Sequence, residues 1–231
     1  VGVVLDQLRE AVGQDADRAR AGLARVAAIR EERGYFNAPT MHSAESPMLP
    51  QRVFRELSEL LPENAILTGD AGSNRMLLNH YFQVRMEGGC LEPGGAAAMG
   101  YAIPAALGAK LACPDRTAVA ICGDGGFAMG MNGLISAIEE GIKIIVVVLN
   151  NVTLGAVYHD TGPHGAVFKE FDYAAMARGM GCHGIRVNEP DELADAIRDA
   201  VESDQPTVID VMVSPKVSFW EAISEPLGNL A

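Results

Sequence analysis

The sequence has little positive charge relative to its negative charge. Its 18 Lys and Arg residues stand against 30 Asp and Glu residues, which gives a formal net charge of −12 at pH 7. Nucleic-acid binding requires a basic face, so this balance argues against a nucleic-acid partner. A small anion can still bind such a protein through a metal ion and backbone N–H groups.

Cysteines are few, and long apolar runs are missing. The four cysteines include no Cys-x-x-Cys pair, and we interpret them as reduced thiols. No apolar run approaches the length of a transmembrane helix. The first residues, VGVVLDQLREAVGQD, lack the basic and then apolar order of a secretory signal. These absences indicate a cytoplasmic protein with no membrane partner.

The sequence does contain a regular alternation of apolar segments. A charged helical stretch (3–33) and a linker rich in Gly, Pro and Ser (34–50) come first. Helices are then expected at 50–62, 97–114, 130–141, 170–181 and 190–203, and strands at 64–70, 117–122, 142–151, 182–188 and 206–214. This alternation predicts an α/β fold, with a doubly wound parallel sheet and helices on both faces.

An acidic residue ends one of the expected strands. In ICGDGGFAMG, Asp124 lies between glycines directly after the apolar run TAVAI. One interpretation is an N-cap for the following helix. The other is a ligand for a divalent cation such as Mg²⁺, which commonly joins a protein carboxylate to phosphate oxygens. The neighbouring glycines would let the backbone approach such a ligand closely.

A second candidate ligand follows the next expected strand. Asn150 and Asn151 end that strand, and residues 126–149 have the length of one helix and one returning strand. The crossover would therefore place Asn151 beside Asp124 in the sheet. The Asn151 amide oxygen and a backbone carbonyl just beyond it would complete a plausible Mg²⁺ shell. We interpret the Asn150 side chain as structural, holding the loop by hydrogen bonds.

The GDG and NN pair at this spacing resembles the signature of thiamine diphosphate-dependent enzymes. The stretch GGAAAMGYAIPAALGAKLACPDRTAVAICGDGGFAM resembles the cofactor-binding part of the acetolactate synthase, pyruvate oxidase and benzoylformate decarboxylase family. The resemblance covers about residues 45 to 215. It implies that residues 1–45 are the helical tail of a preceding domain plus a linker. Residues 46–231 would then be the C-terminal domain that binds the cofactor's diphosphate and Mg²⁺.

The resemblance also assigns site residues. Asp124, the Asn151 side chain and the Thr153 backbone carbonyl would bind Mg²⁺. The Ala97 carbonyl would accept a hydrogen bond from the cofactor's amino group, and Met99 would force its bent shape, although ordinary core packing is the alternative for Met99. The residues implied to contact thiamine diphosphate are Gly72, Ser73, Asn74, Ala97, Met99, Gly123, Gly125, Gly126, Met129, Leu154, Gly155 and Ala156.

Two histidines are weaker candidates for catalysis. His159 follows the metal loop, and His164 lies in the turn TGPHG. Either could relay protons to a bound intermediate, and an exposed loop histidine is the alternative for both. The family's acetohydroxyacid synthases carry Gln-Trp where this chain has His159 and Asp160, which argues against the branched-chain biosynthetic role.

The resemblance implies a lyase or transferase that cleaves or forms C–C bonds of 2-oxo acids or aldehydes, through an acyl-anion equivalent on thiamine diphosphate. The family activates the cofactor with a glutamate from a pyrimidine-binding domain. That domain would lie in the rest of a longer chain or in a separate subunit, so an oligomer is expected. The alternatives are an inactive cofactor-binding or regulatory subunit, and a Rossmann-type oxidoreductase, which would need a GxGxxG motif after an early strand, where none occurs.

Overall fold

The computed structural model describes residues 2–12, 16–34, 36–218 and 220. The described residues up to Ala38 form one compact unit, and those from Pro39 to Trp220 form another. The first unit holds two helices, α1 (Gly2–Val12) and α2 (Ala16–Arg33), as the helical pattern predicted. Their apolar side chains remain exposed within this chain, with Leu23 at 71% and Val26 at 47%.

The second unit is built on a six-stranded sheet in which every pair of neighbouring strands is parallel. The strand order is β2-β1-β3-β4-β6-β5. The strands are β1 (Ile66–Gly69), β2 (Cys90–Leu91), β3 (Ala118–Gly123), β4 (Ile145–Asn150), β5 (His183–Val187) and β6 (Thr207–Met212). The predicted doubly wound α/β fold is therefore confirmed.

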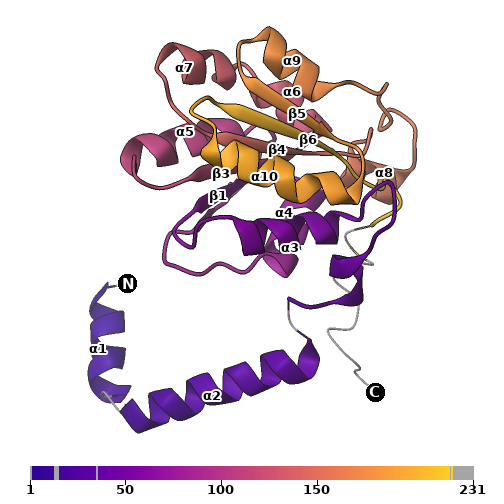
Figure 1. Cartoon of the computed structure of the whole chain (residues 1–231). Helices are drawn as coiled ribbons and strands as arrows, with labels where there is room; N and C mark the ends of the chain where they lie inside the picture. Colours follow the sequence, from indigo (N-terminus) through magenta and orange to yellow (C-terminus); the bar gives the residue numbers. More distant parts are fainter. Residues whose placement is uncertain (1, 13–15, 35, 219, 221–231) are drawn as a thin grey trace. The chain divides into compact units, whose positions relative to one another are not determined.

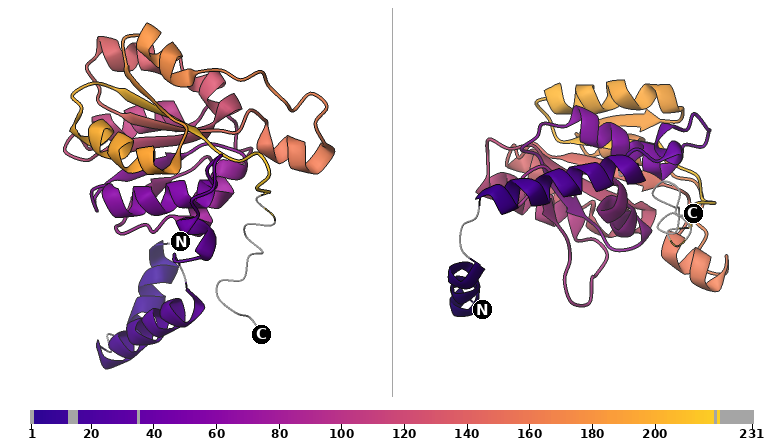
Figure 2. Two further views of the ribbon diagram at one scale, coloured as in Figure 1. Left: turned by 45° about the vertical axis from the view of Figure 1, so that its right-hand side comes forward. Right: turned by 90° about the horizontal axis from the view of Figure 1, so that it is seen from below.

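Helices cover both faces of this sheet (Figure 1). One face is covered by α3 (Pro50–Leu60), α4 (Ser73–Tyr81) and α10 (Leu193–Glu202), and the other by α5 (Ala102–Ala112), α6 (Asp124–Gly130), α7 (Gly133–Glu139) and α9 (Tyr173–Gly179) (Figure 2). The remaining elements are α8 (Gly155–Thr161) and the short 3-10 turns Pro39–His42 and Pro190–Glu192.

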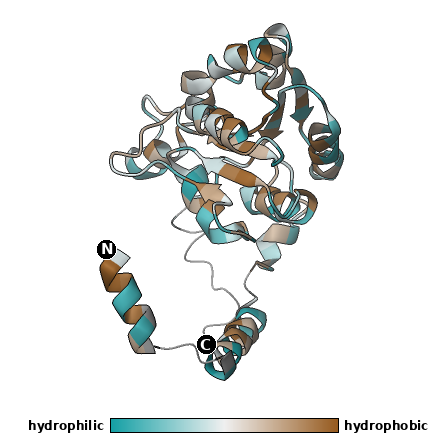
Figure 3. Cartoon of the chain, turned by 90° about the vertical axis from the view of Figure 1, so that its left-hand side faces the viewer, coloured by the Kyte–Doolittle hydropathy of each residue, from teal (hydrophilic) through white to brown (hydrophobic). Residues whose placement is uncertain are grey.

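The central strands have no polar face. All six residues of β4 are buried, as are five of the six in β3. The apolar colour of these inner strands is visible in Figure 3. A parallel strand covered by helices on both sides has no solvent-facing positions, so its sequence loses the polar alternation of an exposed sheet.

Several elements escaped the sequence analysis for identifiable reasons. Helix α8 buries none of its residues, so it carries no apolar stripe to be recognised. Strand β2 has only two residues. Helix α4 has nine residues and begins directly after Gly72, whose φ of 102° gives a sharp entry to the helix.

Residues 39–49, which precede α3, are packed into the second unit. Met41 and Met48 are buried, and Met48 forms a parallel bridge with Val213. Arg52 and Arg55 of α3 donate hydrogen bonds to the carbonyls of Ser43 and Met41. Residues 39–49 thus belong to the sheet-containing unit.

The chain reverses its direction of winding between β1 and β3. It runs from β1 outward to β2, and then returns to β3 on the other side of β1. Ligands of such sheets bind at the carboxyl ends of the strands where the winding reverses. Within the described part of the chain, no helix combines the length and apolar character needed to span a bilayer.

Candidate functional site

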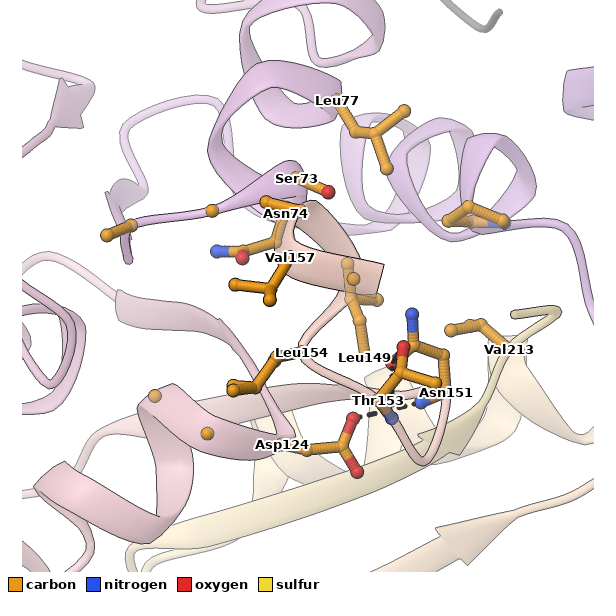
Figure 4. Close-up of a pocket in the computed structure, with 18 of the residues that line it drawn as sticks. Ser73, Asn74, Leu77, Asp124, Leu149, Asn151, Thr153, Leu154, Val157 and Val213 are labelled. Atoms are coloured by element: carbon orange, nitrogen blue, oxygen red, sulfur yellow. Dashed lines mark hydrogen bonds between the residues drawn. The ribbon is translucent and has the colours of Figure 1, made fainter. Parts of the chain in front are cut away.

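A pocket opens at the carboxyl ends of β1, β3 and β4, where the winding reverses (Figure 4). Its walls come from the segments that follow these strands, with contributions from the start of α3 and from the chain after β6. The residues that line it are Pro50, Ala71, Gly72, Ser73, Asn74, Leu77, Met99, Gly123, Asp124, Gly125, Gly126, Leu149, Asn151, Thr153, Leu154, Gly155, Ala156, Val157, Val213, Ser214 and Val217.

Asp124 sits at the floor of this pocket as the first residue of α6. Gly123, not Asp124, occupies the N-cap position, and Asp124 is only 2% exposed. Its Oδ2 accepts a hydrogen bond from the backbone N–H of Asn151 at 3.0 Å, and its Oδ1 accepts one from the Tyr173 hydroxyl at 3.3 Å. The carboxylate therefore reaches across to the loop after β4, which argues against the N-cap interpretation.

Burial raises the pKa values of both Asp124 and Tyr173. It raises the pKa of Asp124 from 3.8 to about 6, although hydrogen bonds from Asn151 and Tyr173 pull the pKa down. Burial, and then the charge of Asp124, raise the pKa of the Tyr173 phenol far above its ordinary value. The phenol therefore stays protonated and acts as a donor. A divalent cation beside Asp124 would favour the ionised carboxylate.

The loop after β4 is held in a specific shape. Val152 adopts a φ of 60°, which is rare for a β-branched residue. The Asn151 Oδ1 accepts hydrogen bonds from the Thr153 backbone N–H at 3.1 Å and from its hydroxyl at 2.9 Å. The segment 166–168 fastens the loop from outside through the bonds Leu154 N–H to the Ala166 carbonyl and Phe168 N–H to the Val152 carbonyl. The loop is thus shaped before any ligand arrives.

The oxygen-bearing groups of this region suit a hard cation. Asp124, Asn151 and Thr153 all line the pocket, and they offer carboxylate, amide and main-chain oxygens. Among the described residues, no three His, Cys, Asp or Glu side chains gather into a metal-binding group. A cation here would therefore depend on the amide and backbone oxygens in addition to one carboxylate.

Glycines leave space where side chains would block the pocket. A Cβ added to Gly125 would lie 2.5 Å from the Met99 Cε and 2.6 Å from the Leu154 Cδ2. With alanine at position 125, the ends of these two apolar side chains would have to shift. A Cβ on Gly126 would instead lie 2.9 Å from the Asp70 Cγ.

The opposite wall is the start of α4, seen with Ser73, Asn74 and Leu77 in Figure 4. The Asn74 amide donates to the Asp70 carbonyl at 3.0 Å, which fixes that side chain. The Ser73 Oγ is buried and has no hydrogen-bond partner in the structure. A buried hydroxyl without a partner is costly, so it marks a place where a ligand could supply one.

Asp70 holds the third segment of the site, the chain from Ala97 to Ala102. Its Oδ1 accepts from the Ala71 and Gly100 N–H groups at 2.8 and 2.9 Å, and its Oδ2 accepts from the Ala102 N–H at 2.9 Å. These bonds set the entry to α5 and present Met99 to the pocket. Met99 is half-buried and lies outside the core, which argues against its core-packing interpretation.

The Asn150 side chain is held by structural hydrogen bonds, as interpreted from the sequence. Its amide donates to the Asp210 Oδ1 at 2.9 Å and to the Phe171 carbonyl at 3.1 Å. Asp210 is fully buried and also accepts from the Tyr173 N–H at 2.9 Å and the Arg186 Nη1 at 3.0 Å. This network joins β4, β5 and β6 to the start of α9.

Four predicted site residues do not line the pocket. Ala97 lies in the turn before Met99 with a φ of 49°, and Met129 is 62% exposed beside Gly100. His159 lies on α8 with its ring edge-on to Tyr158, and its Nε2 is buried without a hydrogen-bond partner. His164 is exposed in the turn that follows α8.

Sequence analysis missed two polar residues of the site, Asp70 in its fastening role and Tyr173. Asp70 ends a strand in the same Gly-Asp pattern as Asp124, which was a usable signal. Tyr173 had no such signal, because it follows Asp124 by 49 positions and meets it only through the fold. The apolar wall of Pro50, Leu77 and Val213 was also missed, since it gathers three distant segments.

Comparison with known proteins shows the family of this chain. Residues 70–211 match the thiamine pyrophosphate enzyme, C-terminal TPP binding domain. The chain is 35% identical over 202 residues to YdaP of Bacillus subtilis (strain 168), named as a thiamine pyrophosphate-containing protein, with 80% of this chain and 35% of that protein covered.

Two further relatives carry the name acetolactate synthase large subunit. The Corynebacterium glutamicum protein is 33% identical over 212 residues, covering 87% of this chain and 33% of its own length. The Methanocaldococcus jannaschii protein is 33% identical over 193 residues, covering 78% of this chain and 33% of its own length. The chain spans about a third of the length of these relatives. With the matched region running from the Asp70 turn through the Asp124 site to β6, the chain belongs to the C-terminal, cofactor-binding domain family of thiamine pyrophosphate enzymes.

Proposed function

We propose that this chain is the diphosphate- and Mg²⁺-binding half of a thiamine diphosphate-dependent decarboxylase or carboligase acting on 2-oxo acids or aldehydes. The observation that carries the proposal is the convergence of Asp124, Asn151 and Thr153 with the unpartnered Ser73 hydroxyl in one pocket. These groups would supply ligands for the metal and for the diphosphate from one pocket.

The residues fit the metal. The Asp124 carboxylate, the Asn151 amide oxygen and the Thr153 carbonyl are the oxygen ligands that Mg²⁺ takes. In the ligand-free chain the Asn151 oxygen accepts two hydrogen bonds from Thr153. These bonds hold the amide oxygen in the loop, and a cation would replace one of them.

The residues also fit the diphosphate. The Ser73 hydroxyl lacks a partner, and the backbone N–H groups at the start of a helix have no partner within the helix. Gly72, Ser73 and Asn74 would bind from the start of α4, and Gly123, Gly125 and Gly126 from the start of α6. Asp124 would repel the anion if no cation lay between them, so the two ligands should bind together.

The bound cofactor would supply the electron sink needed to break or form a C–C bond next to a carbonyl. The chain's own residues would orient it. Met99 would support the rings, with the Ala97 carbonyl accepting a hydrogen bond from the amino group. Leu154, Gly155 and Ala156 would border the reacting end, with Met129 nearby. His159 and His164 are retained as candidates to move protons to the substrate.

The site calls for a second domain. Asp124 is the only acidic residue among the described residues that line the pocket. The activating glutamate expected from the family would therefore come from a pyrimidine-binding domain, in the rest of a longer chain or in another subunit. We also propose an oligomer and a cytoplasmic location, with the helices before residue 46 belonging to a preceding domain. The four free thiols fit a reducing compartment.

The test is Mg²⁺-dependent binding, read by ³¹P NMR of thiamine diphosphate at millimolar concentrations so that weak binding is visible. The wild-type chain should broaden and shift the diphosphate signals with Mg²⁺ and not with EDTA. Asp124→Ala should abolish the Mg²⁺ dependence. Gly125→Ala should fold but push Met99 and Leu154 into the pocket and block binding.

Gly108→Ala is the matched control, because a Cβ there meets nothing within 4 Å. It should bind like the wild type. A wild-type chain with no Mg²⁺-dependent change, or an Asp124→Ala chain that binds equally well, would overturn the proposal. Binding without turnover, once a pyrimidine-binding domain is supplied, would instead favour the alternative of an inactive subunit.

A further inference from the structure

Among the residues that the structure describes, Tyr173 is the one side chain outside the predicted site whose hydroxyl reaches Asp124, the candidate metal ligand. Its phenol donates to the Asp124 Oδ1 at 3.3 Å, while the Asn151 N–H occupies the Oδ2 at 3.0 Å. Each carboxylate oxygen thus has one fixed donor, and an oxygen of an ionised carboxylate has a further lone pair to offer. The two donors fix the carboxylate's direction without consuming its capacity to bind a cation.

The tyrosine is itself held firmly. Its ring is 4% exposed and packs at 5.1 Å between ring centres against Phe127, which lies one turn after Asp124 in α6. Its backbone N–H donates to the buried Asp210 at 2.9 Å. Asp172 is the N-cap of α9, and its side chain accepts a hydrogen bond from the Ala175 N–H. The hydroxyl is therefore aimed at Asp124 by packing and by two backbone anchors.

The same buried carboxylate supports the other candidate ligand. Asp210 binds both the Tyr173 N–H and the Asn150 amide, and Asn150 directly precedes Asn151. Arg186 balances the charge of Asp210 at 3.0 Å. The positions of Asp124 and Asn151 are thus tied to one structural network behind the pocket.

We propose that Tyr173 is a positioning residue that orients Asp124 for the divalent cation. This inference rests on the proposed function, since it concerns the affinity of that same site. Partners behind a metal ligand fix its orientation, and their loss commonly weakens metal binding by tenfold or more. The 3.3 Å contact is longer than a typical O–H···O bond.

The test measures metal affinity, not turnover. Mn²⁺ replaces Mg²⁺ and is titrated into the chain with saturating thiamine diphosphate, and free Mn²⁺ is followed by its EPR signal. Tyr173→Phe keeps the ring and removes the hydroxyl. It should fold as shown by circular dichroism, yet bind Mn²⁺ about tenfold more weakly, with an altered EPR spectrum of the bound ion.

Two controls separate orientation from packing. Tyr81→Phe makes the same chemical change in a buried tyrosine at the far end of α4, and should leave Mn²⁺ affinity unchanged. Phe171→Leu trims a ring 6.3 Å from Tyr173 but keeps the hydroxyl, and should also bind Mn²⁺ normally.

The outcomes are distinct. If the wild-type chain takes up no Mn²⁺ with the cofactor, the proposed function fails and this inference fails with it. If the wild type binds Mn²⁺ and Tyr173→Phe binds it equally well, the inference alone is overturned. A Phe171→Leu chain that loses as much affinity as Tyr173→Phe would overturn it too, because packing rather than the hydroxyl would then matter.

Discussion

Asp70 and Asp124 follow the ends of neighbouring strands in the same Gly-Asp pattern, but their carboxylates have different surroundings. Asp70 accepts from three backbone N–H groups, of Ala71, Gly100 and Ala102, and fastens the entry to α5. Asp124 accepts from one backbone N–H and one phenol, and it lines the pocket. At the scale of the residue, one carboxylate is therefore used up in the fold, and the other keeps capacity for a ligand.

The stability of the chain should depend on pH through the buried Asp124 carboxyl. Burial raises its folded pKa to about 6, above the ordinary 3.8, so in the metal-free chain its contribution to stability is fully present below about pH 4 and lost as pH rises through about 6. The full loss is about 3 kcal/mol. Relative to Asp124→Asn, the metal-free wild type should thus become less stable by up to that amount between pH 4 and 7.

Urea denaturation at a series of pH values, in EDTA, measures this. The exposed Asp115→Asn serves as the control for loss of one negative charge. Parallel stability curves for the wild type and Asp124→Asn across this range would contradict the prediction. Mg²⁺ with thiamine diphosphate should restore wild-type stability at pH 7, since ligands that bind only the folded state stabilise it.

At the scale of the element, the approach of α6 to the turn after β1 shapes the site. Gly126 lies against Asp70, and Gly130 lies against Gly100, where a Cβ would come 3.3 Å from the Gly100 carbonyl oxygen. Glycines let α6 pack closely against the segment that carries Met99. The position of this helix therefore depends on contacts that a single methyl group would disturb.

Gly126→Ala should lower the free energy of unfolding by about 1–3 kcal/mol, the usual range for overpacking a close contact. The added Cβ would meet Asp70 at 2.9 Å, and the three N–H groups on Asp70 prevent that side chain from moving away. Gly108→Ala, in the middle of α5 where an added Cβ has open space, should instead raise the free energy of unfolding by about 0.5–1 kcal/mol. Chemical denaturation of both variants measures these free energies of unfolding. A Gly126→Ala chain as stable as Gly108→Ala would show that the contact can relax.

At the scale of the whole molecule, the proposed function makes this chain one side of a cofactor site. The match covers only about a third of each relative's length, and the described pocket contains a single carboxylate. Proton removal from the cofactor's reactive carbon, under the proposed function, needs an acid at the other end of the cofactor. The described residues around the pocket do not provide one.

The 231-residue chain should therefore exchange the C2 proton of thiamine diphosphate slowly, and addition of a pyrimidine-binding domain should accelerate it. Hydrogen–deuterium exchange followed by ¹H NMR, with Mg²⁺ present, measures both states. The control is free thiamine diphosphate at the same pH. Fast exchange by the chain alone would place the activating acid within this sequence.

Much of this protein could be predicted from local sequence. The buried runs of β3 and β4 predicted a covered parallel sheet, because strands packed on both faces carry no polar alternation. The Gly-Asp-Gly and Asn-Asn segments, one crossover apart, predicted that Asp124 and Asn151 meet, and the structure brings them within hydrogen-bond distance. These features are local, or depend on a single crossover of standard geometry.

Only the tertiary structure decided the rest. Helix α8 buries no residue and so left no pattern. The contact of Tyr173 with Asp124 exists because Asp210, in the last strand, holds the start of α9 beside α6. The apolar wall of Pro50, Leu77 and Val213 gathers segments that lie far apart in the chain. Such contacts depend on the packing of several elements at once, and no short stretch of sequence encodes that packing.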